Sequence, residues 1–326
     1  MGENVRGHRV GEVLAERAAA GSVPGKRDDG FRVALAIEGG GMRGTVSAGM
    51  ALAVRDLGLL PLFDAVYGSS AGAISGAWLL SSGPDGLRGW TDPAFARALI
   101  RRRNLLRARP IVDVERLVEV VYLREFPLDF ASVLANPVEF HPLATDVVTG
   151  RSVDLRPTLT CAADLRLALR ASAALPVLAG RPVPIGAGHY YDAGVAESIP
   201  FRQALRDGAT HILVLRSRRP QDTAPERGTP SLGTRVVAGV GLRRHSTALR
   251  TAFLARTAEL AAADVLLARH DTTTPPDGPA IMSIRPAPDS PRVGRLESHA
   301  PVLQAAFTAG YTAITTHLTP ALPSPP

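Results

Sequence analysis

One local pattern, an apolar strand followed by a glycine-rich turn and a helix of small residues, occurs twice and constrains the fold most strongly. FRVALAIE (31–38) runs into GGGMRG (39–44) and then into the helical pattern of 45–59. DAVYGSS (64–70) runs into AGAISGAWLLSS (71–82). Short, dense apolar runs are typical of buried strands, and strand–turn–helix units in series are typical of a parallel sheet covered by helices. The pattern predicts an α/β protein.

Further elements continue this pattern along the chain. Strands are predicted over 138–148, 151–155, 210–217 and 280–286, and helices over 163–174, 198–208, 234–269 and 293–318. Residues 85–135 have a mostly helical and irregular pattern, and 218–231 form a Pro-rich polar loop.

These boundaries predict a single α/β domain over 31–318, with insertions at 85–135 and 218–278. Residues 1–30 are charged throughout and are expected to form a weakly held leader with one short helix. The tail 319–326 is expected to be disordered. Residues that line a substrate site are expected in 85–135 and 218–290.

Composition favours a globular protein of the cytoplasm. The chain has 326 residues, 45% of them hydrophobic, which is enough for a large core. Its longest apolar runs are far too short to span a bilayer, and its first thirty residues lack the apolar segment of a secretory signal. The single cysteine, Cys161, excludes an intramolecular disulfide and suits a reducing compartment.

The net charge of +7 is carried by arginine, since Lys26 is the only lysine. The densest cluster is RRRNLLRAR (101–109). Charge runs usually form a solvated face, and the alternative is peripheral contact with an anionic membrane surface. Nucleic acid is not expected as a partner, because no aromatic residues that could stack on bases lie near the cluster.

The second turn contains a Gly-x-Ser-x-Gly motif with Ser70 at its centre. Gly68 and Gly72 lack the side chains that would collide in a tight strand–helix turn, which would present the Ser70 hydroxyl at the carboxyl end of the strand. The helix that follows would favour negative charge at this point. Ser70 is therefore a candidate nucleophile, and an idle serine in a structural turn is the alternative.

The first turn suits a developing negative charge. Three consecutive glycines leave backbone N–H groups open to an oxyanion, with Arg43 beside them. The turn also matches a dinucleotide-binding pattern at Gly39, Gly41 and Gly44. That interpretation requires an acidic residue at the end of the second strand, whereas Asp64 precedes the strand.

A serine nucleophile needs a base, and the histidines late in the chain have no local signature of one. They are His189, His211, His245, His270, His299 and His317, of which only His270, in the predicted polar loop HDTTTPPDG, suits a triad. Asp192 in HYYDAGVAESIP is the better candidate, because Ala193 and Gly194 let its loop approach another backbone closely. An aspartate that is hydrogen-bonded to a serine can act as its general base.

Read together, GGGMRG, GSSAG and YDAG resemble the motifs of the patatin-like phospholipase family, in the family's order. ASAALPVLA (171–179) and LATDVVTG (143–150) are also similar to family segments. The resemblance covers about 31–215, with a further similarity at 309–311. It implies a three-layer α/β/α sandwich with a mainly parallel central sheet.

The resemblance also implies roles for these residues. Ser70 would be the nucleophile and Asp192 the base of a Ser–Asp pair that hydrolyses fatty acyl esters without a metal or cofactor. The oxyanion loop would comprise Gly39, Gly40, Gly41, Met42, Arg43 and Gly44, with the amides of Gly40, Gly41 and Met42 as donors.

Two positions depart from the family pattern. Ala193 stands where glycine is usual, and would be strained if that position required a positive φ. Ser198 replaces a common asparagine. The sequence thus predicts a lipid acyl hydrolase, with a catalytically weak lipid-binding protein and a nucleotide-binding α/β protein as alternatives.

Overall fold

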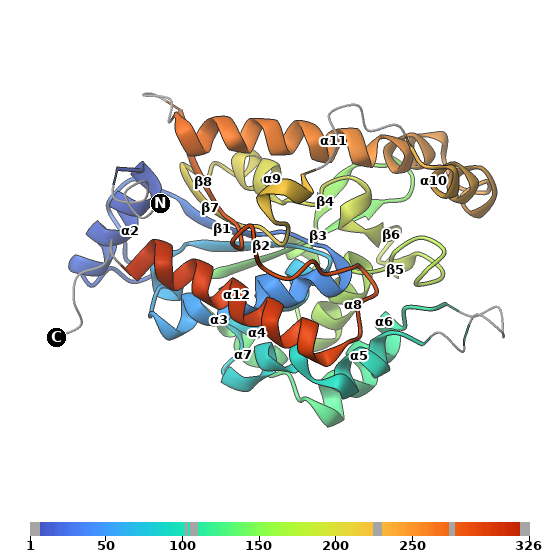
Figure 1. Cartoon of the computed structure of the whole chain (residues 1–326), viewed down its shortest axis with the longest axis horizontal. Coiled ribbons are helices and arrows are strands. Elements are labelled where there is room, and N and C mark those ends of the chain that lie inside the picture. The colour runs from blue at the N-terminus through green and yellow to red at the C-terminus, as the bar shows by residue number, and fades with distance from the viewer. Residues whose placement is uncertain (1–6, 102–103, 105–109, 224–229, 274–277, 320–326) are drawn as a thin grey trace.

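The computed structural model describes residues 7–101, 104, 110–223, 230–273 and 278–319. A sheet of eight strands forms the middle of the molecule, and helices cover both of its faces (Figure 1). The strands are β1 (Val33–Ile37), β2 (Ala65–Ser69), β3 (Glu139–Asp146), β4 (Ser152–Asp154), β5 (Val183–Ile185), β6 (Gly188–Asp192), β7 (His211–Leu215) and β8 (Ala280–Ile284). The helices include α2 (Arg9–Ala19), α3 (Gly44–Asp56), α4 (Ala71–Leu80), α5 (Pro93–Leu99), α6 (Val114–Arg116), α7 (Phe130–Ala135), α8 (Ala162–Ser172), α9 (Phe201–Arg206), α10 (Leu232–Val236), α11 (Thr247–Thr272) and α12 (Ala300–Leu318).

The sheet is mixed but mainly parallel, as the sequence predicts. Its hydrogen-bonded path is β5-β6-β3-β2-β1-β7-β8, with β4 paired to β3. The five strands from β3 to β8 along this path are parallel, whereas β4, β5 and β6 pair antiparallel. Strands that are parallel and buried on both faces read as continuous apolar runs, which explains the VALAI of β1.

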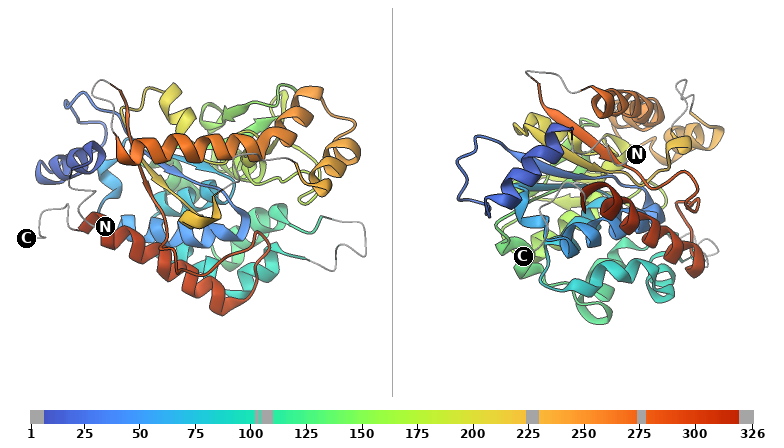
Figure 2. Two further views of the ribbon diagram at one scale, coloured as in Figure 1. Left: turned by 45° about the horizontal axis from the view of Figure 1, so that its top comes forward. Right: turned by 60° about the vertical axis from the view of Figure 1, so that its left-hand side comes forward.

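Alternate residues of the central strands supply two separate cores. Val33, Leu35 and Ile37 of β1 face α3, α4 and α12, whereas Ala34 and Ala36 face α9 and α11. Figure 2 shows the same layers from two further sides, with α11 on one face of the sheet and α12 on the other. The predicted three-layer α/β/α sandwich is confirmed.

Glycines allow α3 and α12 to pack closely against each other. A Cβ atom on Gly49 would lie 2.0 Å from the Phe307 carbonyl oxygen, and one on Gly310 would lie 2.1 Å from that of Val46. The small residues after the first turn are therefore needed for packing.

Two sequence expectations are wrong. The leader is not weakly held over its described part, 7–30, because Val10 and Leu14 of α2 are buried in the main core and Arg17 is buried as well. The last helix begins at Ala300 instead of 293, with Pro301 in its first turn, where a missing N–H costs nothing. Within 101–109 only residues 101 and 104 are described, and the tail from 320 also lies outside the described residues.

Candidate active site

The turn around Ser70 is as tight as its two glycines suggest. A Cβ atom on Gly68 would lie 2.4 Å from Cα of Ala73, and one on Gly72 would lie 2.2 Å from the Ile37 carbonyl oxygen. Ser70 itself has φ 55° and ψ −121°, a conformation that non-glycine residues rarely adopt. It precedes α4 directly, so the free N–H groups of the first helical turn lie beside it. Backbone strain of this kind is concentrated at functional sites.

Strand register brings Asp192 to Ser70. β4 occupies one edge of β3 over Leu143–Thr145, so β2 and β6 must share the other edge. β2 pairs with that edge as far as Ser69 opposite Leu143, and β6 takes over with Asp192 opposite Ala144. Because β6 runs antiparallel to β3, the carboxyl ends of β2 and β6 meet. The Ser70 hydroxyl accordingly donates a hydrogen bond of 2.6 Å to Oδ2 of Asp192.

The carboxylate of Asp192 is buried and held in place from several sides. Only 2% of the surface of Asp192 and 6% of that of Ser70 are exposed to solvent. The Gly194 N–H donates to Oδ1 at 2.7 Å, and the Thr145 hydroxyl donates to the main-chain oxygen of Asp192 at 2.8 Å. Burial raises the pKa of Asp192 to about 6, against the opposing effects of the Ser70 and Gly194 hydrogen bonds and of the Arg295 charge. Such a carboxylate is ionised near neutral pH yet basic enough to accept a proton.

The glycine-rich loop presents fewer free amides than predicted. The N–H of Met42 donates to the carbonyl oxygen of Arg295 at 3.0 Å, and that of Gly39 donates to Ser198 at 3.0 Å. The Gly44 N–H turns back to the loop carbonyls. Met42 is therefore not available as an oxyanion donor. Among the described residues, the N–H groups of Gly40 and Gly41 have no protein acceptor.

Arg295 is the main residue that sequence analysis missed. Its carbonyl oxygen accepts the Met42 N–H and lies 2.6 Å from where a Cβ of Gly41 would stand. Gly41 also has φ 60°, so both the close oxygen and the backbone conformation favour glycine at this position. The expected helix from 293 concealed this role. Gly294 just before it and Pro301 beyond it were the signals for an irregular segment here.

Ser172 also has a position that the sequence did not reveal, although its segment was noted. It is fully buried at the end of α8, and its hydroxyl oxygen accepts the Ser70 N–H at 3.0 Å. This bond holds the strained backbone of Ser70, while the Ser70 side chain is held by its hydrogen bond to Asp192.

No histidine lines the cavity that contains Ser70, judged over the described residues, which include all eight histidines. His270 is not in a loop but in the last turn of α11, where its carbonyl oxygen lies 3.3 Å from Nε2 of His8.

The two alternative functions, a nucleotide-binding protein and a catalytically weak lipid-binding protein, also lose their sequence support. Asp64 lies at the amino end of β2 and pairs with Arg17, away from any nucleotide at the glycine loop. Ala193 does not have a positive φ, so its alanine is not strained.

The cavity beside the Ser70–Asp192 pair has a volume of about 370 Å³ and one apolar wall. This wall consists of Leu175, Pro176, Val177, Leu178, Val195, Val237 and Phe253. Four arginines also line this cavity: Arg43, Arg218, Arg256 and Arg295. The predicted contribution of 85–135 is wrong for its described residues, none of which line the cavity.

One group of metal-ligating side chains lies elsewhere. Ligand atoms of His141, Asp154 and Asp207 lie within 4.8 Å of one another. Nδ1 of His141 is already 2.8 Å from Asp154, and its ring stacks on Tyr67 at 4.2 Å. None of these side chains lines the cavity, so we assign the group no part in this site.

The mainly parallel sheet with helices on both faces, together with a strained serine turn, a buried aspartate and a glycine loop, has the architecture of an α/β hydrolase. The sequence profile of the patatin-like phospholipases matches residues 35–205, about half of the chain. The chain therefore belongs to the patatin-like phospholipase family, a family of lipid acyl hydrolases.

Curated relatives are similar over part of their length. The uncharacterized protein YjjU of Escherichia coli K12 is 28% identical over 201 residues, which cover 57% of this chain and 52% of YjjU. An uncharacterized NTE family protein of Mycobacterium tuberculosis is 29% identical over 180 residues, which cover 52% of this chain and 44% of that protein. The chain thus spans about half the length of the curated relatives it matches.

Proposed function

We propose that this protein hydrolyses fatty acyl esters through an acyl-enzyme on Ser70, with Asp192 as the general base. The observation that carries the proposal is the 2.6 Å hydrogen bond between the two side chains at the end of a strained turn. Oγ of Ser70 attacks the ester carbonyl carbon while its proton passes to Oδ2 of Asp192. The tetrahedral intermediate collapses, and the leaving alkoxide takes this proton. Water then attacks the acyl-enzyme in the same way and regenerates Ser70.

The surroundings of the pair suit the other demands of this reaction. The free N–H groups of Gly40 and Gly41, with the positive charge of Arg43 beside them, are proposed to hold the oxyanion. The apolar wall from Leu175 to Leu178 is proposed to contact the acyl chain. The proposed steps need no cofactor, because in each of them a proton passes only between Asp192 and an oxygen of Ser70, of water or of the substrate.

Substitution of the two residues tests the proposal. Ser70→Ala and Asp192→Asn should each lower kcat for p-nitrophenyl butyrate by more than about a thousandfold, as loss of a nucleophile or its base does in other serine hydrolases. Ser69→Ala is the matched control: the Ser69 hydroxyl donates to the Glu197 carbonyl at 2.8 Å, and this variant should still be acylated. Retained hydrolysis in either of the first two variants contradicts the mechanism.

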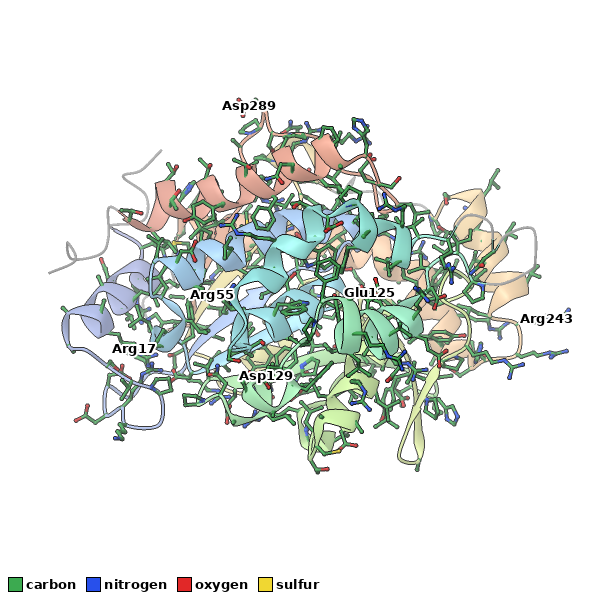
Figure 3. All side chains as sticks on the ribbon, turned by 90° about the horizontal axis from the view of Figure 1, so that it is seen from below. Arg17, Arg55, Glu125, Asp129, Arg243 and Asp289 are labelled. Carbon is green, nitrogen blue, oxygen red and sulfur yellow. The ribbon has the colours of Figure 1, made fainter. Side chains whose placement is uncertain are left out.

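We further propose that the protein works at an anionic membrane surface. Among the described residues, no helix is long and apolar enough to cross a membrane. However, α10 and the helical turn Val237–Gly241 expose Leu232, Val236 and Val240, spaced four residues apart in the same segment that lines the cavity through Gly233, Thr234 and Val237. Arg243, just beyond them, projects outward at this end of the molecule (Figure 3). An apolar stripe flanked by arginine is typical of interfacial helices.

Vesicle sedimentation tests the membrane contact. The protein should bind phosphatidylglycerol vesicles more strongly than phosphatidylcholine vesicles, and Leu232→Ser with Val236→Ser should weaken binding to both. Leu123→Ser, which alters another exposed apolar residue away from the cavity, is the control. Equal binding by the double variant and the unaltered protein would rule out this surface.

A further inference from the structure

A second cavity adjoins the first, and six arginines are among the residues that line it. It has a volume of about 480 Å³ and shares Arg43, Arg218, Arg256 and Arg295 with the cavity of Ser70. Arg219 and Arg292 line only the second cavity. Among the described residues, Asp222 is the one carboxylate on its wall. Six arginines therefore line a space that shares part of its wall with the cavity of the proposed catalytic pair.

Two of these arginines are compensated. Arg219 binds Asp222 through two hydrogen bonds of 2.7 and 3.1 Å. Arg218 lies 3.4 Å from Glu38, whose other oxygen is already 3.1 Å from the buried Arg216. Within the described part of the chain, Arg43, Arg256, Arg292 and Arg295 form no ion pair.

The uncompensated groups repel one another in a partly buried space. Burial, with the charge of Arg218 next, lowers the pKa of Arg43 to about 10. Burial, with the charge of Arg295 next, lowers the pKa of Arg256 to about 10. In addition, Nε of Arg43 is buried and has no hydrogen-bond partner among the described residues. Arg256 donates hydrogen bonds to the Phe253 carbonyl oxygen at 2.7 Å and the Thr234 hydroxyl at 3.0 Å, which supply no negative charge. Folding thus leaves a concave site in which six arginines face a single carboxylate among the described residues.

We propose that this second cavity binds the phosphate group of the acyl ester substrate. Guanidinium groups form paired, charge-assisted hydrogen bonds with phosphate, and a cavity lined by one sign of charge concentrates ligands of the other. In a glycerophospholipid the phosphate is only a few bonds from the scissile ester, which matches two cavities with a common wall. The inference rests on the proposed ester hydrolysis and narrows it to esters that carry an anionic phosphate.

Short substrates that do not form micelles separate this site from attraction to a charged surface. The hexanoyl monoester of glycerol phosphate and monohexanoylglycerol carry the same acyl group. The first should have the higher kcat/KM by about tenfold or more, the factor that one charge-assisted hydrogen bond provides. Inorganic phosphate should inhibit its hydrolysis competitively and affect that of the neutral ester less.

Two variants locate the preference in the second cavity. Arg256→Gln and Arg292→Gln should each lower the ratio of the two kcat/KM values toward one. Arg292 is exposed, and its side chain forms no hydrogen bond or ion pair among the described residues, so this variant keeps the test valid if Arg256→Gln destabilises the protein. Arg116→Gln, an exposed arginine that lines neither cavity, should leave the ratio unchanged.

The outcomes distinguish this inference from the proposed function. Hydrolysis of both esters with a ratio near one would overturn the phosphate site and leave the Ser70 mechanism standing. No hydrolysis of either ester would refute the function itself. Inhibition of both esters to the same extent by inorganic phosphate, with a ratio near one, would mean that the cavity binds a free anion and not the substrate's phosphate.

Discussion

Arginines gather at both ends of the central sheet, but several of those at the carboxyl end form no ion pair among the described residues. At the amino ends of the strands, Arg17 is 2% exposed and its guanidinium binds Asp29 at 2.7 Å and Asp64 at 2.9 Å. At the carboxyl ends, Arg43, Arg256 and Arg295 surround the cavities without an ion pair in the described part of the chain. Figure 3 places Arg17 and Arg243 at the two opposite ends. Paired charges hold the fold together, whereas unpaired charges around a cavity are available to a ligand.

The same contrast applies to the backbone and to the carboxylates. Asp64 at the amino end accepts hydrogen bonds from Arg17 and from the Val33 N–H, so its negative charge is compensated within the fold. Asp192 at the carboxyl end is buried, forms no ion pair within the described part of the chain, and lies beside a serine with a positive φ. Stability is thus given up at the end where we propose chemistry, as is common at functional sites.

The largest expected effect lies at the amino end. Arg17→Gln should lower the free energy of unfolding by about 3 kcal/mol, because it leaves Asp29 without an ion-pair partner and Asp64 with Arg27 alone. Urea unfolding followed by circular dichroism measures this change. The folded variant should keep the hydrolytic kcat of the unaltered protein. A loss of kcat without a loss of stability would erase the contrast between the two ends.

At the carboxyl end, Asp192→Asn should have the opposite effect on stability. The folded-state pKa of Asp192 is about 6, above its ordinary value, so folding favours the protonated carboxyl. Stability is lost as pH rises from roughly 4 through 6, because the buried group must then ionise. Asparagine never ionises.

Thermal unfolding over a range of pH measures this difference. The Asn variant should be more stable than the unaltered protein above pH 6, by about 2 to 3 kcal/mol for a shift of roughly two pH units. The advantage should vanish below about pH 4. A variant that is less stable at high pH would mean that the Asp192 charge stabilises the fold.

The smallest expected effect concerns backbone strain. Ser70→Gly and Ser70→Ala both remove the hydroxyl, but only glycine adopts the φ of 55° without strain. The glycine variant should therefore be the more stable by about 1 kcal/mol. In α2 the order should reverse: Ala18→Gly should lower stability by about 1 kcal/mol. The same order at both positions would show that the Ser70 turn is not strained.

The sequence was sufficient for the local parts of this account. Apolar runs and glycine turns identified most of the strands, the parallel sheet covered by helices and the turns at Gly39–Gly44 and Gly68–Gly72, and the family resemblance added the three-layer arrangement. These features depend on residues close together in the chain, so the pattern contains them. The burial of α2 was missed because its charged residues suggested a solvated segment, whereas Arg17 is neutralised by aspartates that lie 12 and 47 residues further along.

Long-range geometry could not be predicted in the same way. The meeting of Ser70 and Asp192 depends on which strands share an edge of β3, and only the small residues after Asp192 and the family resemblance suggested it beforehand. Arg295 approaches the glycine loop from the other end of the chain, in a segment whose apolar spacing imitates a helix. The arginine-lined cavity unites residues from four separate loops and helices, which no local pattern records.

Trapping of the acyl-enzyme tests the central claim most directly. The protein is mixed with p-nitrophenyl butyrate, quenched in acid within the first turnovers and analysed by peptide mass spectrometry. We predict a butyryl group on Ser70, and none in Asp192→Asn over the same time. A butyryl group on Ser69 or another residue, or steady release of p-nitrophenol without acylation of Ser70, would contradict the account.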